Sequence, residues 1–359
     1  MPAKPIDHNK QKARAVTELT RQTLLSLPTA CSDFIRAIAP HTSALTRLAY
    51  AQDLRLFFRY LSAESPKFAN YEPDQWTDAA LDQIQSRDIE MFLDYLTLYQ
   101  RTDDKTDEST EFTNAELGKM RKLSTLRSLY KYLFKNSRVT ANVAVLVDMP
   151  KRHEKPILRL EIDEVAKLLD MVESGTGFTE RQNAYNQHTN RRDFAMLTLF
   201  LGTGIRVSEC VGMDIHDIDF RTESFLVTRK GGNQAILYFP EEVTKVMKDY
   251  IKWRMDQEAL PGHEQALFLS LQKKRIGVRA VEMMVKKYAM LVAPLKSRMS
   301  PHKLRSTFGT NLYRETGDIY VVADVLGHSD VNTTRRHYAD MSDERRRMAA
   351  KSVKLRDDE

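Results

Sequence analysis

Several kinds of residue and segment are scarce in this sequence, and each scarcity excludes a class of protein. The two cysteines among 359 residues, Cys31 and Cys210, are too few for a disulfide framework or a cysteine-rich metal site, so we expect both to be small apolar core residues. Glycine (13 residues) and proline (12 residues) are too sparse for a collagen-like or low-complexity chain. No apolar run approaches the ~18–20 residues that cross a bilayer, and the N-terminus lacks the apolar stretch of a signal peptide. These absences predict a soluble protein of the cytoplasm.

The sequence does contain a moderate excess of basic residues and enough apolar residues for large cores. Lys and Arg number 55 and Asp and Glu number 49, which gives a formal net charge of +6. This balance allows a polyanionic partner such as nucleic acid without requiring one. At roughly 100–200 residues per domain, the length predicts two or three domains. The hydrophobic fraction of 42% is sufficient for their cores.

The first part of the chain is predicted to be helical. Residues 1–28 are polar and basic, and we expect an N-terminal arm or a first amphipathic helix there. Apolar residues at helical spacing predict two helices, over residues 42–62 and 86–99, and a basic helix or helix pair is expected over residues 113–136. Ser86 is the expected N-cap of the second of these helices. The charged segment 101–112 is expected to be an exposed loop, so residues 29–148 are predicted to form one small all-helical domain.

A change in composition marks a boundary near residue 150. Pro150 and Pro156 stand among basic residues, and because proline blocks helix continuation, residues 149–160 are predicted to be an interdomain linker. A second domain over residues 161–359 follows. Its predicted elements are helices over 161–174 and 193–204, a polar surface insertion over 175–192, a β-hairpin over 224–239 that turns at 230–233, and further helices after residue 240. The predicted fold class is therefore mainly α with a small antiparallel β-sheet.

Two segments of the second domain carry polar residues that packing alone would not require. GTGIRVSE places Arg206 directly after an apolar helix that Gly202 and Gly204 should end, and Glu209 could be its carboxylate partner at i+3. SPHKLRST places His302 and Arg305 on one face of a helix that should begin after Ser300. Both residues would lie near the positive end of that helix, which favours an anion such as phosphate.

The remaining candidates are Lys230 in the hairpin turn and the residues His328 and Tyr338 in VLGHSDVNTTRRHYADM. Each of them alone is more often a packed or solvated residue than a catalytic one. The full set of candidates is Arg206, Lys230, His302, Arg305, His328 and Tyr338. It includes no clustered carboxylates for Mg²⁺, and the chain has no GxxxxGK[ST] loop. The set favours metal-free phosphoryl transfer, in which two guanidiniums stabilise a pentacoordinate phosphorane, a tyrosine attacks and a lysine protonates the leaving oxygen.

The order of these motifs resembles that of the tyrosine recombinases, which are also called the phage integrase family. GTGIRVSE, VTRKGGN, SPHKLRST, LGHSDVNTT and RRHYADM follow one another as in that family. TRLAYAQDLRLFFRYL and RKLSTLRSLYKYL resemble the family's core-binding domain, so the resemblance covers nearly the whole chain beyond residue 28. It implies a helical SAM-like core-binding domain and a catalytic domain that together form a C-shaped DNA clamp.

The resemblance also implies a mechanism. Tyr338 would attack a DNA phosphodiester to give a 3′-phosphotyrosyl link and a 5′-hydroxyl, while the two arginines stabilise the transition state. His328 would be a further hydrogen-bond donor, His302 the general base and Lys230 the general acid. A homotetramer on two DNA sites would exchange strands through a Holliday junction, without metal, ATP or another cofactor. An accessory regulatory protein is a further partner that the family allows.

Within the family, the chain resembles the single-recombinase Xer proteins of streptococci and lactococci (XerS), which resolve chromosome dimers at a dif-like site. The alternatives are an integrase or excisionase of a mobile genetic element, a type IB topoisomerase and a non-catalytic DNA-binding regulator. The helical first domain argues against the topoisomerase, and the presence of all six candidates argues against the regulator. The chain departs from the family at Ser306, where many relatives have histidine, and in the ten-residue spacing from His328 to Tyr338, where many Xer proteins have nine.

Basic residues outside the active site are the expected DNA contacts. The candidates in helix 113–136 and in the linker are Lys119, Arg121, Lys122, Arg127, Lys131, Lys151 and Arg152. On composition alone, a solvated linker is an equally good interpretation of the last two. The tail over 339–359 is expected to be a helix that is either solvated or, as the family implies, docked on a neighbouring protomer.

Overall fold

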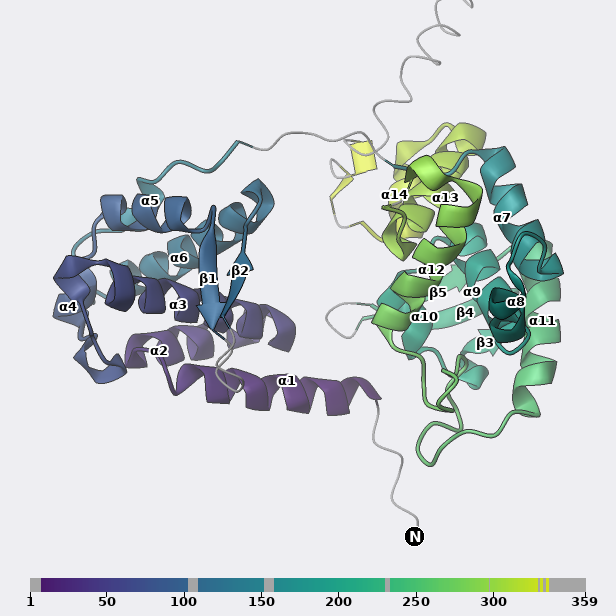
Figure 1. The fold of residues 1–359 in the computed structure, drawn as a ribbon, viewed down its shortest axis with the longest axis horizontal. Coiled ribbons are helices and arrows are strands. Elements are labelled where there is room, and N and C mark those ends of the chain that lie inside the picture. Colours follow the sequence, from purple (N-terminus) through teal and green to yellow (C-terminus); the bar gives the residue numbers. More distant parts are fainter. Residues whose placement is uncertain are drawn as a thin grey trace, which may run out of the picture. The chain divides into compact units, whose positions relative to one another are not determined.

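The chain folds into two compact units, Met1–Glu154 and Lys155–Glu359, and the division falls inside the predicted linker (Figure 1). A computed structural model describes residues 8–102, 109–151, 158–229, 233–296, 298–328, 330–331 and 334–335. Cys31 and Cys210 are both fully buried, one in each unit, as predicted. None of the helices in the described ranges is long and apolar enough to cross a membrane.

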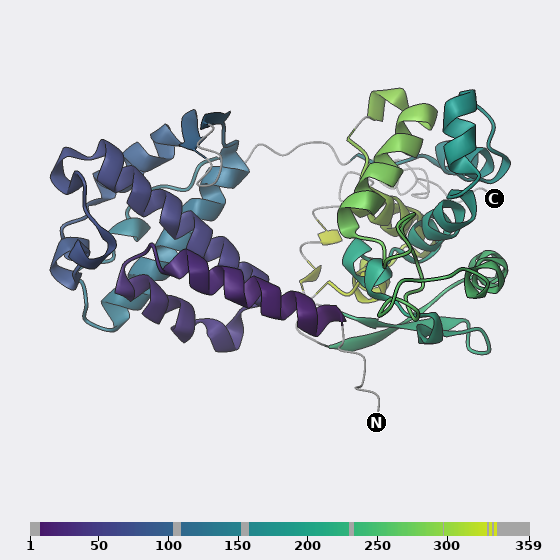
Figure 2. The same ribbon diagram turned by 60° about the horizontal axis from the view of Figure 1, so that its bottom comes forward.

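The first unit is a bundle of helices with one small hairpin. Its helices are α1 (His8–Leu24), α2 (Thr29–Ala37), α3 (Ala44–Glu64), α4 (Asp78–Asp82), α5 (Ser86–Tyr95) and α6 (Glu116–Lys135). The helix α1 packs along α3 (Figure 2). Of the two structures expected for residues 1–28, an arm or an amphipathic helix, residues 8–24 therefore form the helix. The helices α3 and α6 also contact each other, and both contribute to one core.

The long helix α3 follows the hydrophobic pattern of the sequence. It begins after Ser43, whose hydroxyl accepts a hydrogen bond from the backbone N–H of Thr46 at 3.2 Å. The four apolar residues that predicted this helix, Leu54, Phe57, Phe58 and Leu61, are all buried. The ring of Phe57 packs edge-to-face on that of Phe92 from α5, with 5.1 Å between the ring centroids. This aromatic contact joins the two predicted helices across the core.

Two expectations for the first unit were wrong. The segment predicted to be an exposed loop contributes to an antiparallel hairpin of β1 (Tyr99–Thr102) and β2 (Ser109–Phe112), so the unit is not purely helical. Stacking of Tyr99 on Phe112, with ring centroids 5.9 Å apart, joins the two strands. The N-cap of α5 is Gln85 rather than Ser86, because the carboxylate of Asp88 accepts the Gln85 backbone N–H at 2.8 Å in a capping box.

The second unit places eight described helices around a three-stranded antiparallel sheet. The helices are α7 (Ile162–Ser174), α8 (Glu180–Asn186), α9 (Asn190–Thr203), α10 (Val207–Gly212), α11 (Glu241–Met255), α12 (Val278–Val292), α13 (Pro301–Thr316) and α14 (Ile319–Leu326). The strands are β3 (Ile218–Asp219), β4 (Ser224–Thr228) and β5 (Gln234–Tyr238). The pairing of β4 with β5 confirms the predicted hairpin, and residues 230–232 of its turn lie outside the described residues.

The helix α9 is the central element of the second unit. It contacts α7, α11 and α13, and the side chains from Ala195 to Phe200 are buried on every face. Gly204 ends it in the left-handed conformation (φ 62°), whereas Gly202 lies inside the helix, so only one of the two expected terminators acts as one.

The polar insertion after α7 is more than a surface feature. It contains α8, and both Asn186 and Thr189 are buried. The phenol oxygen of Tyr288 from α12 lies 2.8 Å from the side-chain oxygen of Asn186 and 2.8 Å from that of Asp193 in α9. These buried polar contacts attach the insertion to the core of the unit.

Candidate active site

The first predicted site residue, Arg206, is held at the junction between α9 and α10. Glu209, which is almost fully buried, fixes it twice. One carboxylate oxygen accepts the Arg206 backbone N–H at 3.0 Å, and the other accepts a guanidinium N–H at 2.9 Å. The second guanidinium nitrogen donates to the carbonyl oxygen of Gly327 at 2.9 Å. The predicted Arg206–Glu209 ion pair is therefore confirmed, and it orients Arg206 toward the C-terminal end of α14.

The second arginine, Arg305, joins the two ends of the site. It lies in α13 with only 5% of its surface exposed, and its guanidinium donates to the carbonyl oxygens of Gly204 and Leu326. The left-handed glycine is needed here, because a β-carbon on Gly204 would lie 3.0 Å from Leu326 and still closer to Phe308. The buried arginine thus links the end of α9 to the end of α14.

The histidine His328 follows Gly327, the left-handed residue that ends α14. Its backbone N–H donates to the carbonyl oxygen of Ala323 at 2.9 Å, which fixes the chain where it leaves the helix. On the side chain, Nδ1 lies 2.8 Å from the hydroxyl oxygen of the fully buried Thr334. Sequence reasoning did not single out Thr334, although a hydroxyl six residues after the histidine in LGHSDVNTT was the available signal.

Three of the six predicted residues therefore meet around one helix end. Arg206, Arg305 and His328 all contact or follow the last residues of α14. The predicted residues Lys230 and Tyr338 lie outside the described residues. His302 is exposed in the first turn of α13, one turn before Arg305. Both residues lie near the N-terminus of α13, as expected, and the guanidinium of Arg305 also donates to two backbone carbonyls.

The start of α13 differs from the expected cap in one respect. Ser300 occupies the N-cap position and Pro301 the first helical position, as predicted, but the serine side chain makes no capping hydrogen bond. Ser306, which stands where many relatives carry histidine, is buried and donates its hydroxyl to the carbonyl oxygen of His302 at 3.1 Å. Within the described part of the chain, no group of three or more His, Cys, Asp and Glu side chains could hold a metal ion.

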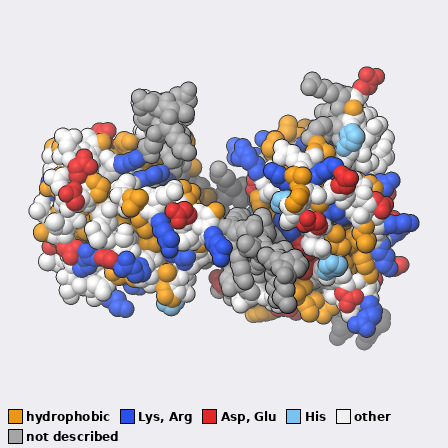
Figure 3. Space-filling model, turned by 90° about the horizontal axis from the view of Figure 1, so that it is seen from below, with side chains coloured by type: hydrophobic (Ala, Val, Ile, Leu, Met, Phe, Trp, Pro, Cys, Tyr) orange, Lys and Arg blue, Asp and Glu red, His pale blue; other side chains and the backbone are white. Residues whose placement is uncertain are grey.

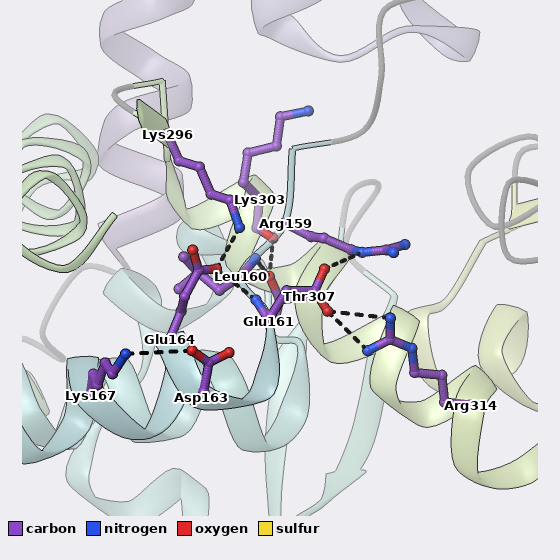
Figure 4. A network of polar contacts seen from close by, with 10 residues as sticks. All are labelled: Arg159, Leu160, Glu161, Asp163, Glu164, Lys167, Lys296, Lys303, Thr307 and Arg314. Carbon is purple, nitrogen blue, oxygen red and sulfur yellow. Dashed lines mark hydrogen bonds and ion pairs between the residues drawn. The ribbon is translucent and has the colours of Figure 1, made fainter. Parts of the chain in front are cut away.

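A network of ion pairs attaches the start of the second unit to α13 (Figure 4). The carboxylate of Glu161 accepts hydrogen bonds from Arg159 at 3.2 Å and from Arg314 at 3.3 Å. The backbone N–H of Leu160 donates to the hydroxyl of Thr307 at 3.0 Å, two residues beyond Arg305. Burial alone would raise the pKa of Glu161, but the hydrogen bonds and charges of Arg159 and Arg314 outweigh it and lower that pKa.

The predicted DNA-contact residues of α6 are mostly engaged inside the first unit. Arg121 forms a bidentate ion pair with the buried Asp53 of α3, with one N–O distance of 2.7 Å. Lys122 is buried and donates to Asn114 at 2.8 Å, and Arg127 donates to the carbonyl oxygens of Ala144 and Val147.

The other candidates in and after α6 are more open. Lys119 donates to the hydroxyl of Thr97 at 2.8 Å, Lys131 and Lys151 are exposed, and Arg152 lies outside the described residues. On the face drawn in Figure 3, basic and acidic side chains are interspersed over each unit. The net charge of the chain therefore does not by itself mark a DNA-binding surface.

Comparison with known proteins agrees with this arrangement. The family model described as "Phage integrase family" matches residues 159–345. A tyrosine recombinase XerC of Caldanaerobacter subterraneus subsp. tengcongensis is 32% identical over 329 residues, which cover 89% of this chain and 85% of the relative. A tyrosine recombinase XerS of Lactococcus lactis subsp. cremoris is 30% identical over 312 residues, which cover 80% of this chain and 85% of the relative.

Solved structures show the same fold at lower identity. A XerH site-specific recombinase bound to a palindromic difH substrate, in a post-cleavage complex, matches with a TM-score of 0.59 and 17% identity over 82% of this chain and 76% of that chain. A lambda integrase dimer bound to a core site matches with a TM-score of 0.57 and 15% identity over 86% of this chain and 94% of that chain.

The fold is that of the solved XerH and lambda integrase structures, and in this chain two arginines lie beside a histidine within it. The sequence comparisons place the chain directly. It belongs to the phage integrase family, and it is a tyrosine site-specific recombinase.

Proposed function

We propose that this enzyme cuts and rejoins DNA at a dif-like site through a 3′-phosphotyrosyl intermediate and a Holliday junction, and so resolves chromosome dimers. The observation that carries the chemistry is the convergence of Arg206 and Arg305 on the end of α14, where Arg305 contacts Leu326, the last residue of the helix, and Arg206 contacts Gly327, which follows it. His328 follows directly, and Tyr338 comes ten residues later in the sequence. The phosphate-binding groups therefore meet at a point in the fold that the chain leaves ten residues before its nucleophile.

The two arginines are suited to stabilise a phosphorane because their orientation is fixed before DNA arrives. Each guanidinium carries five N–H groups in one plane. Backbone carbonyls from Gly327, Gly204 and Leu326 hold the two planes in place. Donors that are already oriented pay no reorganisation cost when charge develops on the non-bridging oxygens, so they lower the barrier.

The Thr334 hydroxyl gives His328 a defined role. When that hydroxyl donates to Nδ1, the neutral imidazole carries its proton on Nε2. An Nε2–H group can then donate to a non-bridging oxygen of the phosphate. In the same scheme the exposed His302 accepts the proton of Tyr338, and Lys230 protonates the leaving 5′-oxygen. Attack of a partner strand's 5′-hydroxyl reverses the step, so the phosphodiester energy is retained without ATP or metal.

The DNA partner is supported by the relatives. The solved XerH complex contains a difH substrate, and the lambda integrase dimer is bound to a core site. In our proposal, a homotetramer holds two such sites. Phosphates, and not bases, are then contacted by the exposed Lys131 and Lys151, by Lys119 and by the exposed part of the Arg121 side chain. An accessory protein that times the second strand exchange is compatible with this assembly.

The alternative role is integration or excision of a mobile element, which is favoured by the match to a lambda integrase structure. A strand-exchange assay separates the two roles. Linear duplexes of different length are prepared in two pairs, one carrying the dif-like site of the encoding chromosome and one carrying the ends of a resident mobile element. We expect products of new length from the first pair alone, in EDTA and without a second recombinase. Products from the mobile-element pair alone would favour the alternative.

A further inference from the structure

The last described residue before the turn of the β4–β5 hairpin is also an arginine that lies beside the active site. Arg229 directly follows β4, and its backbone N–H donates to the carbonyl oxygen of Asn233 at 2.7 Å. This hydrogen bond continues the pairing of Thr228 with Gln234 and fixes where the Arg229 side chain leaves the sheet. The position of Arg229 is therefore set by the described strands and not by the turn.

The guanidinium of Arg229 covers Gly327. A β-carbon added to Gly327 would fall on the guanidinium, with one terminal nitrogen 2.8 Å away and the other terminal nitrogen and the central carbon closer. Gly327 is the same residue whose carbonyl oxygen accepts from Arg206. Two guanidiniums from separate elements thus contact one residue, while Arg305 is bonded to the residue before it.

The three arginines differ in how their charge is compensated. Arg206 is paired with the carboxylate of Glu209, and Arg305 is bonded to two carbonyl oxygens. In contrast, Nε of Arg229 is buried without a hydrogen-bond acceptor, and no ion pair joins Arg229 to a carboxylate among the described residues. A half-buried cation with an unsatisfied donor costs free energy unless an anion supplies the missing acceptor.

We propose that Arg229 is a third catalytic guanidinium, which contacts a non-bridging oxygen of the scissile phosphate beside Arg206. This inference rests on the proposed function, because it assumes that a phosphodiester occupies the site. In the cleavage step, the Tyr338 phenol gives its proton to His302 and its oxygen forms a bond to phosphorus, while the bond from phosphorus to the 5′-oxygen breaks and that oxygen takes a proton from Lys230 to leave as a hydroxyl. Arg229 neutralises charge on the phosphate while this exchange takes place.

The test compares cleavage of two suicide duplexes, each nicked close to the scissile position. One carries the normal phosphate there, and the other carries a methylphosphonate, in which an uncharged methyl group replaces one non-bridging oxygen. The enzymes are the wild type, Arg229→Ala and Arg229→Lys, with Arg221→Ala as a matched control from the exposed β3–β4 turn. Melting temperatures show whether each variant is folded, and the lysine variant keeps a cation should the alanine variant unfold.

We expect Arg229→Ala to slow cleavage of the phosphate duplex by about 10²-fold, the effect of removing one donor to a developing oxyanion. Its defect should shrink to a few-fold on the methylphosphonate, where there is less charge to neutralise, and Arg229→Lys should fall between. An equal defect on both duplexes, or no defect, would overturn the inference while leaving the proposed function intact. If the wild type cleaved neither of the two duplexes, both the role of Arg229 and the proposed function would be overturned.

Discussion

At the scale of single residues, the orientations of three side chains of the candidate site are fixed by hydrogen bonds to backbone carbonyls or to a hydroxyl. Arg206 and Arg305 donate to carbonyl oxygens at the ends of α9 and α14, and His328 is held by Thr334. The carbonyl partners are not identifiable from residue spacing, because carbonyl acceptors are contributed by the fold and not by residue type, whereas Thr334 could have been found from its position six residues after the histidine. The motifs indicated which side chains matter, and the structure shows what orients them.

The arginines give the first prediction. Arg206→Lys and Arg305→Lys should each slow DNA cleavage by about 10²–10³-fold, because an ammonium cannot reproduce the planar fork of donors. Single-turnover cleavage measures this rate, and a filter-binding assay at the same salt concentration measures affinity. Affinity should change far less than rate. A loss of binding as large as the loss of rate would contradict a transition-state role.

A second residue-scale prediction concerns Asp53 and Arg121. Asp53 is 4% exposed and depends on Arg121 and Thr125 for its hydrogen bonds. Arg121→Ala should lower the free energy of unfolding by about 1–3 kcal/mol, because it leaves a buried carboxylate short of donors. Urea denaturation measures the loss. Lys131→Ala, from the exposed face of the same helix, is the control and should leave the urea midpoint unchanged.

At the scale of secondary-structure elements, the ion pairs of Glu161 stabilise the contact between α13 and the segment that precedes α7. Because the pKa of Glu161 is lowered in the folded state, its contribution to stability is fully present above the ordinary glutamate pKa of 4.5 and is lost as the pH falls below it. Glu161→Gln should therefore reduce stability near neutral pH, and the difference from wild type should vanish in acid.

The measurement is the urea midpoint of wild type and Glu161→Gln over a series of pH values. Asp163→Asn is the matched control, since Asp163 pairs only with the exposed Lys167 at 3.5 Å on the surface of α7. That variant should follow the wild type at every pH. A difference for Glu161→Gln that grows as the pH falls would show that the sign of the linkage is wrong.

The secondary structure was predictable where the hydrophobic period is strong and unpredictable where tertiary contacts decide. Leu54, Phe57, Phe58 and Leu61 define α3 from the sequence alone, and the β4–β5 hairpin is visible in two short apolar runs that flank a glycine-containing turn sequence. The β1–β2 hairpin has no such pattern and depends on aromatic stacking between Tyr99 and Phe112. The sequence also could not show that Lys122 and Arg127 of α6 donate to acceptors inside the first unit.

At the scale of the whole molecule, the C-terminal tail should separate assembly from DNA binding. The family implies that residues 339–359, which lie outside the described residues, dock on a neighbouring protomer. Deleting residues 343–359 should then impair recombination between two duplexes far more than binding of one protomer to a half-site. Gel-shift titration and product formation measure the two quantities. An equal loss of both would contradict the docking role.

The central claim is that Tyr338 forms a covalent bond to DNA, and one measurement tests it most directly. A labelled suicide duplex carrying the recombination site is incubated with enzyme in EDTA, and the products are separated on a denaturing gel. We expect a covalent protein–DNA adduct with the wild type, and none with Tyr338→Phe, which should still bind the duplex with wild-type affinity. An adduct that persists in Tyr338→Phe would contradict the assignment of the nucleophile.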